Sequence, residues 1–230
     1  MKIIVVAATE TEIAPLIKAF VYSSSINNNL KQYYYKGLEV FVLITGVGMT
    51  ATAYHLGKTF AHTRYDAALN LGLAGSFDKK IHIGDVVNVT TDIFSELGAE
   101  DGEKFLTIQE IGLLKNDEFP YEEGQLINNI QIKSKVLAAL SMVKAITVNS
   151  VHGNDESIKK AAKKFSPQVE SMEGAAFLYG CLTENIPYAQ VRAISNYVER
   201  RNKENWNIGL AIENLNKKTL EIINDLTIDK

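Results

Sequence analysis

Five short clusters of polar and glycine residues carry the side chains that are best suited to chemistry. Four of them end an apolar run and begin a helix or a turn, and the fifth stands just ahead of a helix. The clusters are Thr9 to Glu12, Gly46 to Gly48, Gly72 to Ser76, Ser195 to Arg201 and, ahead of the helix, Ser171 to Gly174. Carboxylates and amides can move protons or bind a polar ligand. Glycines let the backbone approach that ligand closely.

Each cluster also has an ordinary structural explanation when it is taken alone. Glu12 and Glu173 stand near the starts of predicted helices, where the helix dipole favours an acid. Asn196 follows a predicted strand, where asparagine commonly forms a turn. The glycines of 46–48 and 72–75 match neither the GxGxxG dinucleotide fingerprint nor the GxxxxGK[ST] phosphate loop. The sequence therefore gives no support to a dinucleotide or nucleoside-triphosphate site.

The elements that must position these clusters alternate between strands and helices. Apolar, β-branched runs predict strands at 3–8, 39–44, 66–71, 85–89, 145–149 and 188–194, the second of them paired with 32–35 in a hairpin. Helical spacing predicts helices at 10–20, 49–62, 155–165, 173–183 and 208–226. We expect 23–29 to be a polar turn and 92–125 to be rich in loops.

This order predicts an α/β fold, a single domain over residues 1–230 with a mixed central β-sheet flanked by helices. In such sheets a ligand binds at the carboxyl ends of the strands, which is where the clusters stand. We therefore expect the five clusters to meet there.

Composition excludes several classes of protein. The 230 residues are 46% hydrophobic and 22% charged, with a formal net charge of −3, which is typical of a globular chain without a basic nucleic-acid surface. Cys181 is the only cysteine, so a disulfide framework is excluded. No window approaches the roughly 18 apolar residues of a membrane span. We expect a cytoplasmic protein that binds neither membrane nor nucleic acid.

Together, the motifs resemble the nucleoside phosphorylase/nucleosidase superfamily, closest to its methylthioadenosine/S-adenosylhomocysteine nucleosidase branch. The resemblance runs from residue 1 to about residue 225, through Ala8 to Glu12, Asn70 to Gly75, Ile83 to Val87, Met172 to Ala176 and Val191 to Ser195. It implies a nucleoside phosphorylase-like fold, a small nucleoside as partner, and cleavage of an N-glycosidic bond by water. It also implies a homodimer or larger homo-oligomer, without a metal or other cofactor.

The resemblance also implies roles for individual residues. Glu12 matches the acid that activates the attacking water, and Glu173 matches the acceptor of the ribose hydroxyls, with Met172 packed against the sugar. Two carboxylates suit a reaction in which positive charge develops on the sugar. The matched positions Ala74, Gly75 and Ser195 are expected to contact the substrate.

Asn196 departs from the adenine-specific branch, which has an aspartate after the serine of Ala-Ile-Ser. The Hoogsteen edge of adenine offers one acceptor and one donor, whereas a 6-oxopurine offers two acceptors, N7 and O6. An asparagine amide supplies N–H donors to that edge. Asn196 is therefore expected to take a catalytic role at the base, and it favours hypoxanthine or guanine over adenine.

Three further segments are similar to the futalosine hydrolase family, namely Leu97 to Gly102, Ser195 to Asn202 and Asn205 to Ile208. Arg200 stands where that family is expected to have proline. The resemblance implies release of hypoxanthine from futalosine in the alternative menaquinone pathway. Futalosine carries a carboxylate on its 5′ side, which requires a cation and apolar walls. The candidates are Arg201 and Arg200 for the carboxylate, and Trp206, Phe94 and Phe105 for the walls.

Several alternatives stay open. His152 is either a contact of the purine base or an ordinary loop histidine, and Arg201 and Trp206 are either site residues or a solvated loop and core packing. With Arg64 at a helix end and Arg192 inside a strand, no arginine is expected at a phosphate position, so water is the favoured nucleophile. Residues 92–125 are a candidate donor to a neighbouring subunit's site. The remaining functions are a nucleosidase or phosphorylase for inosine or methylthioadenosine, or a nonenzymatic nucleoside-binding protein.

Overall fold

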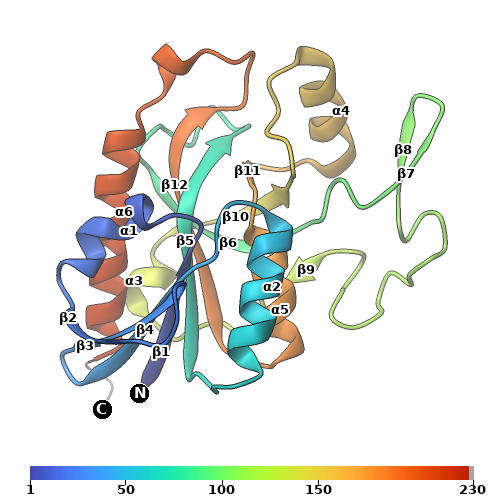
Figure 1. Cartoon of the computed structure of the whole chain (residues 1–230). Coiled ribbons are helices and arrows are strands. Elements are labelled where there is room, and N and C mark those ends of the chain that lie inside the picture. The colour runs from blue at the N-terminus through green and yellow to red at the C-terminus, as the bar shows by residue number, and fades with distance from the viewer. Residues whose placement is uncertain (228–230) are drawn as a thin grey trace.

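The computed structural model describes residues 1–227 and consists of a large mixed sheet with helices on both sides (Figure 1). The strands are β1 (Lys2–Ala7), β2 (Val21–Ser25), β3 (Leu30–Tyr35), β4 (Leu38–Ile44), β5 (Ala67–Ser76), β6 (Val86–Asp92), β7 (Gly98–Asp101), β8 (Lys104–Thr107), β9 (Leu126–Ile127), β10 (Ser141–Thr147), β11 (Val169–Ser171) and β12 (Tyr188–Tyr197). The helices are α1 (Glu10–Ile17), α2 (Met49–Phe60), α3 (Lys135–Ala138), α4 (Asp155–Phe165), α5 (Gly174–Thr183) and α6 (Ile208–Asp225), with a 3₁₀ turn at Lys203–Asn205.

The main sheet has the order β11-β10-β6-β12-β5-β1-β4-β3-β2, and β9 pairs with β6. Strands β4, β1, β5 and β12 run parallel, whereas β6 is antiparallel to β12. A further antiparallel pairing joins β11 to β5 and closes five strands into a ring. The predicted α/β fold with a mixed central sheet is confirmed.

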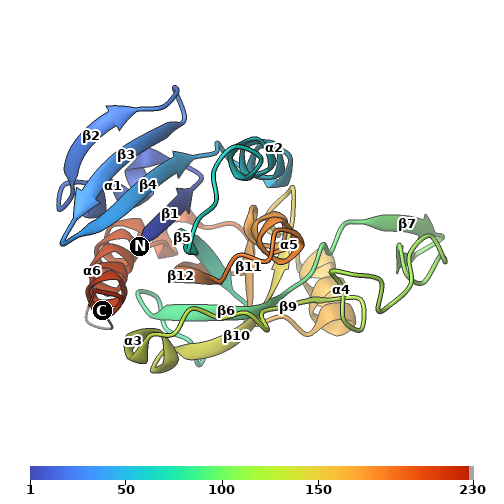
Figure 2. The ribbon, with the colours of Figure 1, turned by 90° about the horizontal axis from the view of Figure 1, so that it is seen from below.

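Both faces of β1 are covered, which explains its unbroken apolar sequence. Ile3, Val5 and Ala7 belong to the core on the side of α1 and α6. Ile4 and Val6 belong to the core on the side of α2 and α5. Figure 2 shows α6 on one side of this part of the sheet, and α2 and α5 on the other.

Two segments contain strands that the sequence analysis did not predict. The expected polar turn at 23–29 overlaps β2, an edge strand that is mostly exposed. The expected loops at 92–125 contain the hairpin of β7 and β8, which stands away from the main sheet (Figure 1). Exposed strands lack the alternation of apolar and polar residues that marks a half-buried strand. Among the described residues, none of the helices has the length and apolar character that crossing a membrane requires.

Asn216 of α6 fixes helix α1, which carries Glu12. The Asn216 amide donates to the Glu12 carbonyl at 2.8 Å and accepts from the Leu16 N–H at 2.9 Å. An α-helix joins these two backbone groups across one turn. Here Pro15 lies between them, and the buried Asn216 side chain bridges them. The bridge ties the first helix to the last.

We predict that Asn216→Ala lowers the free energy of unfolding by about 1–3 kcal/mol, because it removes partners from buried backbone groups. Urea unfolding measures this change. Lys217→Ala, at the next and exposed position of α6, is the control and should change it by less than about 0.5 kcal/mol. Equal losses in the two variants would contradict the bridging role of Asn216.

Candidate active site

The Glu12 carboxylate joins the start of α1 to strand β5. Its Oε2 accepts hydrogen bonds from the Thr9 N–H and the Thr9 hydroxyl, both at 2.9 Å, which completes a capping box. Its Oε1 accepts from the Leu73 N–H at 3.3 Å. The Oε2 atom of Glu12 therefore caps helix α1, which is the ordinary structural role expected of an acid at a helix start. The other oxygen lies at β5, and the carboxylate remains half-buried.

Glu173 precedes α5 and is nearly enclosed, with 6% of its surface exposed. Its Oε1 accepts a hydrogen bond from the Gly48 N–H at 3.1 Å. Its Oε2 lies 3.8 Å from Nη1 of Arg192. The glycine cluster after β4 and the acid before α5 therefore meet, as expected from their positions at strand ends.

Arg192 is a buried cation beside Glu173 that the sequence analysis did not place among the site residues. Its side chain is 1% exposed and donates through Nη2 to the Asn70 side-chain oxygen. A side chain at Gly72 would overlap its guanidinium and would lie within 3.1 Å of the Glu12 carboxylate, so only glycine fits there. Arg192 lies inside strand β12, as predicted, and its buried guanidinium reaches the carboxylate of Glu173. The sequence does show a single cation inside an apolar strand. Because a buried charge needs a partner, this pattern predicts a nearby anion.

The buried Arg192 bears on the choice of nucleophile. No arginine was expected at a phosphate position, and Arg192 lies 3.8 Å from the Glu173 carboxylate. The Arg192 Nε has no hydrogen-bond partner within residues 1–227. The prediction that water, rather than phosphate, attacks the sugar therefore rests on the Glu12 carboxylate and no longer on the absence of an arginine.

A β-bulge positions Asn196. Strand β12 pairs Ile194 with Ala74 and then Asn196 with Gly75, so Ser195 is the extra residue. Bulges of this kind re-aim side chains beside functional sites. The Ser195 hydroxyl donates to the Asn196 Oδ1 at 2.8 Å, and the Asn196 Nδ2 donates to the Tyr197 carbonyl at 2.9 Å. The side-chain oxygen of Asn196 therefore already accepts one hydrogen bond. The bond to the Tyr197 carbonyl uses one of the two Nδ2 protons, and the other proton remains.

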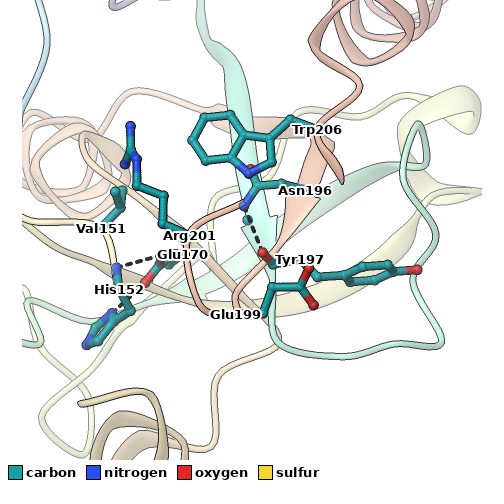
Figure 3. Close-up of a pocket in the computed structure, with 9 residues that line it drawn as sticks. Val151, His152, Glu170, Asn196, Tyr197, Glu199, Arg201 and Trp206 are labelled. Carbon is teal, nitrogen blue, oxygen red and sulfur yellow. Dashed lines mark hydrogen bonds and ion pairs between the residues drawn. The ribbon is translucent and has the colours of Figure 1, made fainter. Parts of the chain in front are cut away.

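A pocket surrounds Asn196, and most of its side chains are drawn in Figure 3. Its lining consists of Gly75, Val151, His152, Glu170, Asn196, Tyr197, Glu199, Arg201 and Trp206. Five of these residues are sequence-predicted site residues, namely Gly75, His152, Asn196, Arg201 and Trp206. The structure therefore brings the predicted base contact and the predicted loop residues into one place.

His152 and Glu170 form a closely bonded pair in this pocket. Glu170 is 3% exposed and accepts from the His152 backbone N–H at 3.0 Å and from its Nδ1 at 2.6 Å. The bond to Glu170 raises the pKa of His152 and outweighs the opposing effect of burial. Glu170 was not identified from the sequence, where an acid in a short strand carries no distinguishing pattern.

Arg201 lies over Trp206, with its Cζ 5.2 Å from the ring centroid. Both residues share the pocket with Asn196. Phe94 and Phe105, the other expected walls, do not line this pocket. Phe94 packs near Tyr179, and Phe105 packs near Phe165.

Strand β5 connects the carboxylate cluster to this pocket. Gly72 lies beside Glu12 and Arg192, and Gly75 lies in the pocket, three residues or about 10 Å further along the strand. Ala74 lies between them and is buried. Met172 is half-buried next to Glu173. Hydrogen bonds thus join the Thr9 to Glu12 cluster to β5 and Gly48 to Glu173, and Gly75 shares the pocket with Asn196. Within residues 1–227, no group of three or more His, Cys, Asp or Glu is arranged to hold a metal.

Asp92 forms a buried network beside Gly174, the residue that follows Glu173. Its carboxylate accepts from the Thr147 hydroxyl at 2.8 Å and from the Gln190 amide at 3.1 Å. The same Thr147 hydroxyl accepts from the Ala175 N–H at 2.8 Å, in the first turn of α5. The network ties three strands to the helix that follows Glu173. Desolvation raises the pKa of Asp92 to about 6.

We predict that Asp92 makes stability fall as pH rises. Because its folded-state pKa is raised, its neutral form stabilises the fold below about pH 4, and this contribution is lost as pH passes 6. The free energy of unfolding should drop by up to about 3 kcal/mol between these limits. Asp92→Asn should flatten the profile in urea unfolding from pH 4 to 7, whereas Asp101→Asn on the exposed hairpin should not. Parallel profiles for wild type and Asp92→Asn would contradict the prediction.

Comparisons with known proteins identify the family of this chain. The model of the phosphorylase superfamily matches residues 2–226. A futalosine hydrolase from Thermus thermophilus is 28% identical over 177 residues, which cover 74% of this chain and 75% of the relative. A 5′-methylthioadenosine/S-adenosylhomocysteine nucleosidase from Glaesserella parasuis is 24% identical over 222 residues, which cover 94% and 90%.

Solved structures share the fold at low identity. The methylthioadenosine/S-adenosylhomocysteine nucleosidase of Colwellia psychrerythraea, in complex with adenine, has a TM-score of 0.81 at 20% identity and covers 98% of this chain and 96% of its own. The futalosine hydrolase of Helicobacter pylori has a TM-score of 0.80 at 16% identity and covers 97% of each chain. The nucleoside phosphorylase-like fold is thereby confirmed. Because the family model spans nearly the whole described chain, this protein belongs to the phosphorylase superfamily.

Proposed function

We propose that this protein is a nucleosidase that hydrolyses the N-glycosidic bond of a 6-oxopurine nucleoside, and that its substrate is futalosine. The products are then hypoxanthine and dehypoxanthine futalosine. The observation that carries the proposal is Asn196, whose oxygen is held by Ser195 while its amide nitrogen retains a proton for a ligand. The relatives named futalosine hydrolase and nucleosidase support hydrolysis as the reaction class.

The carboxylate cluster is suited to the sugar. Positive charge develops on the ribose as the base departs, and preorganised carboxylates stabilise such charge. Glu12 deprotonates the attacking water through the half-buried oxygen that lies at β5. Glu173 accepts from the ribose hydroxyls, and Arg192 holds its carboxylate in place. Water adds to the anomeric carbon, the bond to the base nitrogen breaks, and the water's proton passes to Glu12.

The pocket around Asn196 is suited to the base. The N7 and O6 atoms of a 6-oxopurine are both acceptors, and the amide N–H of Asn196 donates to them. This hydrogen bond stabilises the negative charge that the departing base acquires. Arg201, exposed and stacked on Trp206, supplies the cation for the carboxylate of futalosine.

A second candidate is a methylthioadenosine/S-adenosylhomocysteine nucleosidase. It is favoured by the Glaesserella relative, which matches 94% of this chain against 74% for the Thermus relative. An asparagine amide turned by 180° would also present an oxygen to the amino group of adenine. The two candidates therefore differ in the purine that the pocket accepts.

Base release measured by chromatography separates the candidates. Futalosine, inosine and methylthioadenosine are incubated with the enzyme in parallel. Hypoxanthine released from futalosine, with much slower cleavage of the other two, is the expected result. Adenine released fastest from methylthioadenosine would overturn the proposal in favour of the second candidate. No release from any substrate would favour a nonenzymatic binding protein.

We predict that Glu12→Gln lowers kcat by about 100-fold or more, because the amide cannot take the proton of the water. Glu10→Gln is the matched control, since Glu10 lies on the same helix but pairs on the surface with Lys31. It should leave kcat unchanged. Steady-state kinetics on the cleaved nucleoside measure both. Full turnover in Glu12→Gln would remove Glu12 from the role of base.

We predict that Asn196→Asp lowers kcat/KM for the 6-oxopurine nucleoside by about 10- to 100-fold, because a carboxylate would face two acceptors. Cleavage of methylthioadenosine should fall less or rise. The ratio of the two kcat/KM values, measured for each protein, reports this change. An unchanged ratio would rule out base recognition by Asn196.

A further inference from the structure

We propose that Glu170 selects the purine by accepting the N1–H of a 6-oxopurine, on the side of the base away from the sugar. This inference rests on the proposed function and names a second specificity residue for the same pocket. Glu170 belongs to β11 and lines the pocket together with Asn196 (Figure 3).

The strand pairing places Glu170 and Asn196 on either side of one backbone position. Gly75 pairs with Glu170 across β11 and with Asn196 across β12. A Cβ at Gly75 would lie 3.0 Å from the Val198 Cγ2, 3.2 Å from the Asn196 Nδ2 and 3.6 Å from the Glu170 Cγ, so a side chain there would crowd both polar groups. With glycine at this position, Glu170 and Asn196 line the same pocket. A flat base lying over Gly75 can then contact both groups.

Glu170 retains capacity to accept hydrogen bonds. It is 3% exposed, and a buried carboxylate is stable only when it is bonded. His152 supplies two donors, its backbone N–H and its Nδ1. An ionised carboxylate has about four acceptor sites. The pair therefore holds the carboxylate in position and leaves acceptor sites for a ligand.

The second carboxylate that lines the pocket, that of Glu199, is bonded to residues outside the pocket. Glu199 accepts from the Lys79 ammonium at 2.9 Å and from the Asn205 amide at 2.9 Å. Its bonds with Lys79 and Asn205 hold it at the outer loop. Among the acids that line the pocket, Glu170 is thus the one enclosed beside Asn196 and Gly75.

The chemistry of the two purines differs most at N1. A 6-oxopurine carries a proton on N1 and donates it, whereas N1 of adenine is an acceptor. A carboxylate attracts the first and repels the second. Asn196 alone separates the purines less sharply, because a rotated amide offers either a donor or an acceptor. Glu170 cannot reverse its role while it is ionised, so it supplies the discrimination.

Binding of free bases tests this without any variant. Hypoxanthine, 1-methylhypoxanthine and adenine are titrated into the wild-type enzyme by calorimetry. Hypoxanthine should bind about 10-fold or more tightly than the other two, because methylation removes the N1 proton and adenine lacks it. Equal affinity for hypoxanthine and 1-methylhypoxanthine would overturn the role of Glu170. A preference for adenine over hypoxanthine would overturn the proposed function as well.

Glu170→Gln should reduce the ratio of hypoxanthine to adenine affinity to within about threefold, because an amide can either donate to N1 or accept from it. Glu199→Gln is the matched control, a carboxylate of the same pocket that should leave the ratio unchanged. Thermal unfolding establishes that each variant is folded. A wild-type ratio in Glu170→Gln, with the control also unchanged, would contradict the inference.

Discussion

The buried ion pair of Arg192 and Glu173 is the constraint on which the rest of the site depends. A guanidinium in the central strand of a sheet is stable only beside an anion and hydrogen-bond acceptors, which Glu173 and Asn70 provide. The pair fixes where α5 begins and requires glycine at position 72. Asp92 and Thr147 secure the first turn of α5. The contacts that stabilise this part of the fold therefore also fix the position of the Glu173 carboxylate.

Strand β5 organises the site along its length. The acidic cluster lies at its Gly72 end and the base pocket at its Gly75 end, so the charge that suits a sugar and the amide that suits a purine are separated by about 10 Å. The bulge at Ser195 and the pairing of β11 with β5 bring Asn196 and Glu170 to the same point from opposite sides. Gly75, Asn196 and Glu170 line one pocket there, which distinguishes this end of the sheet from ordinary core. A nucleoside laid along β5 would meet each group in turn.

The strands and helices of the core were predictable because their burial leaves a pattern. The unbroken run at 3–8 indicates a strand covered on both faces, and β1 is such a strand. The hairpin of β7 and β8 was not predictable, because its exposed residues carry no alternation. In the candidate site, Glu12, Glu173 and Asn196 were predicted from motifs at strand ends, and the structure places Glu12 against β5, Glu173 against Gly48 and Asn196 in the pocket. Arg192 and Glu170 were not, because their contacts, an ion pair for Arg192 and a strand pairing for Glu170, join segments that are separate in the sequence, which no local pattern records.

The attacking nucleophile is identified most directly by cleaving the purine nucleoside in water enriched in oxygen-18, with and without phosphate. Mass spectrometry of the sugar product then shows which group was added at the anomeric carbon. If Glu12 activates water, one labelled oxygen appears on that carbon, and phosphate changes neither the rate nor the product. A sugar 1-phosphate, or a rate that rises with phosphate, would contradict hydrolysis and would assign phosphate to the site beside Arg192.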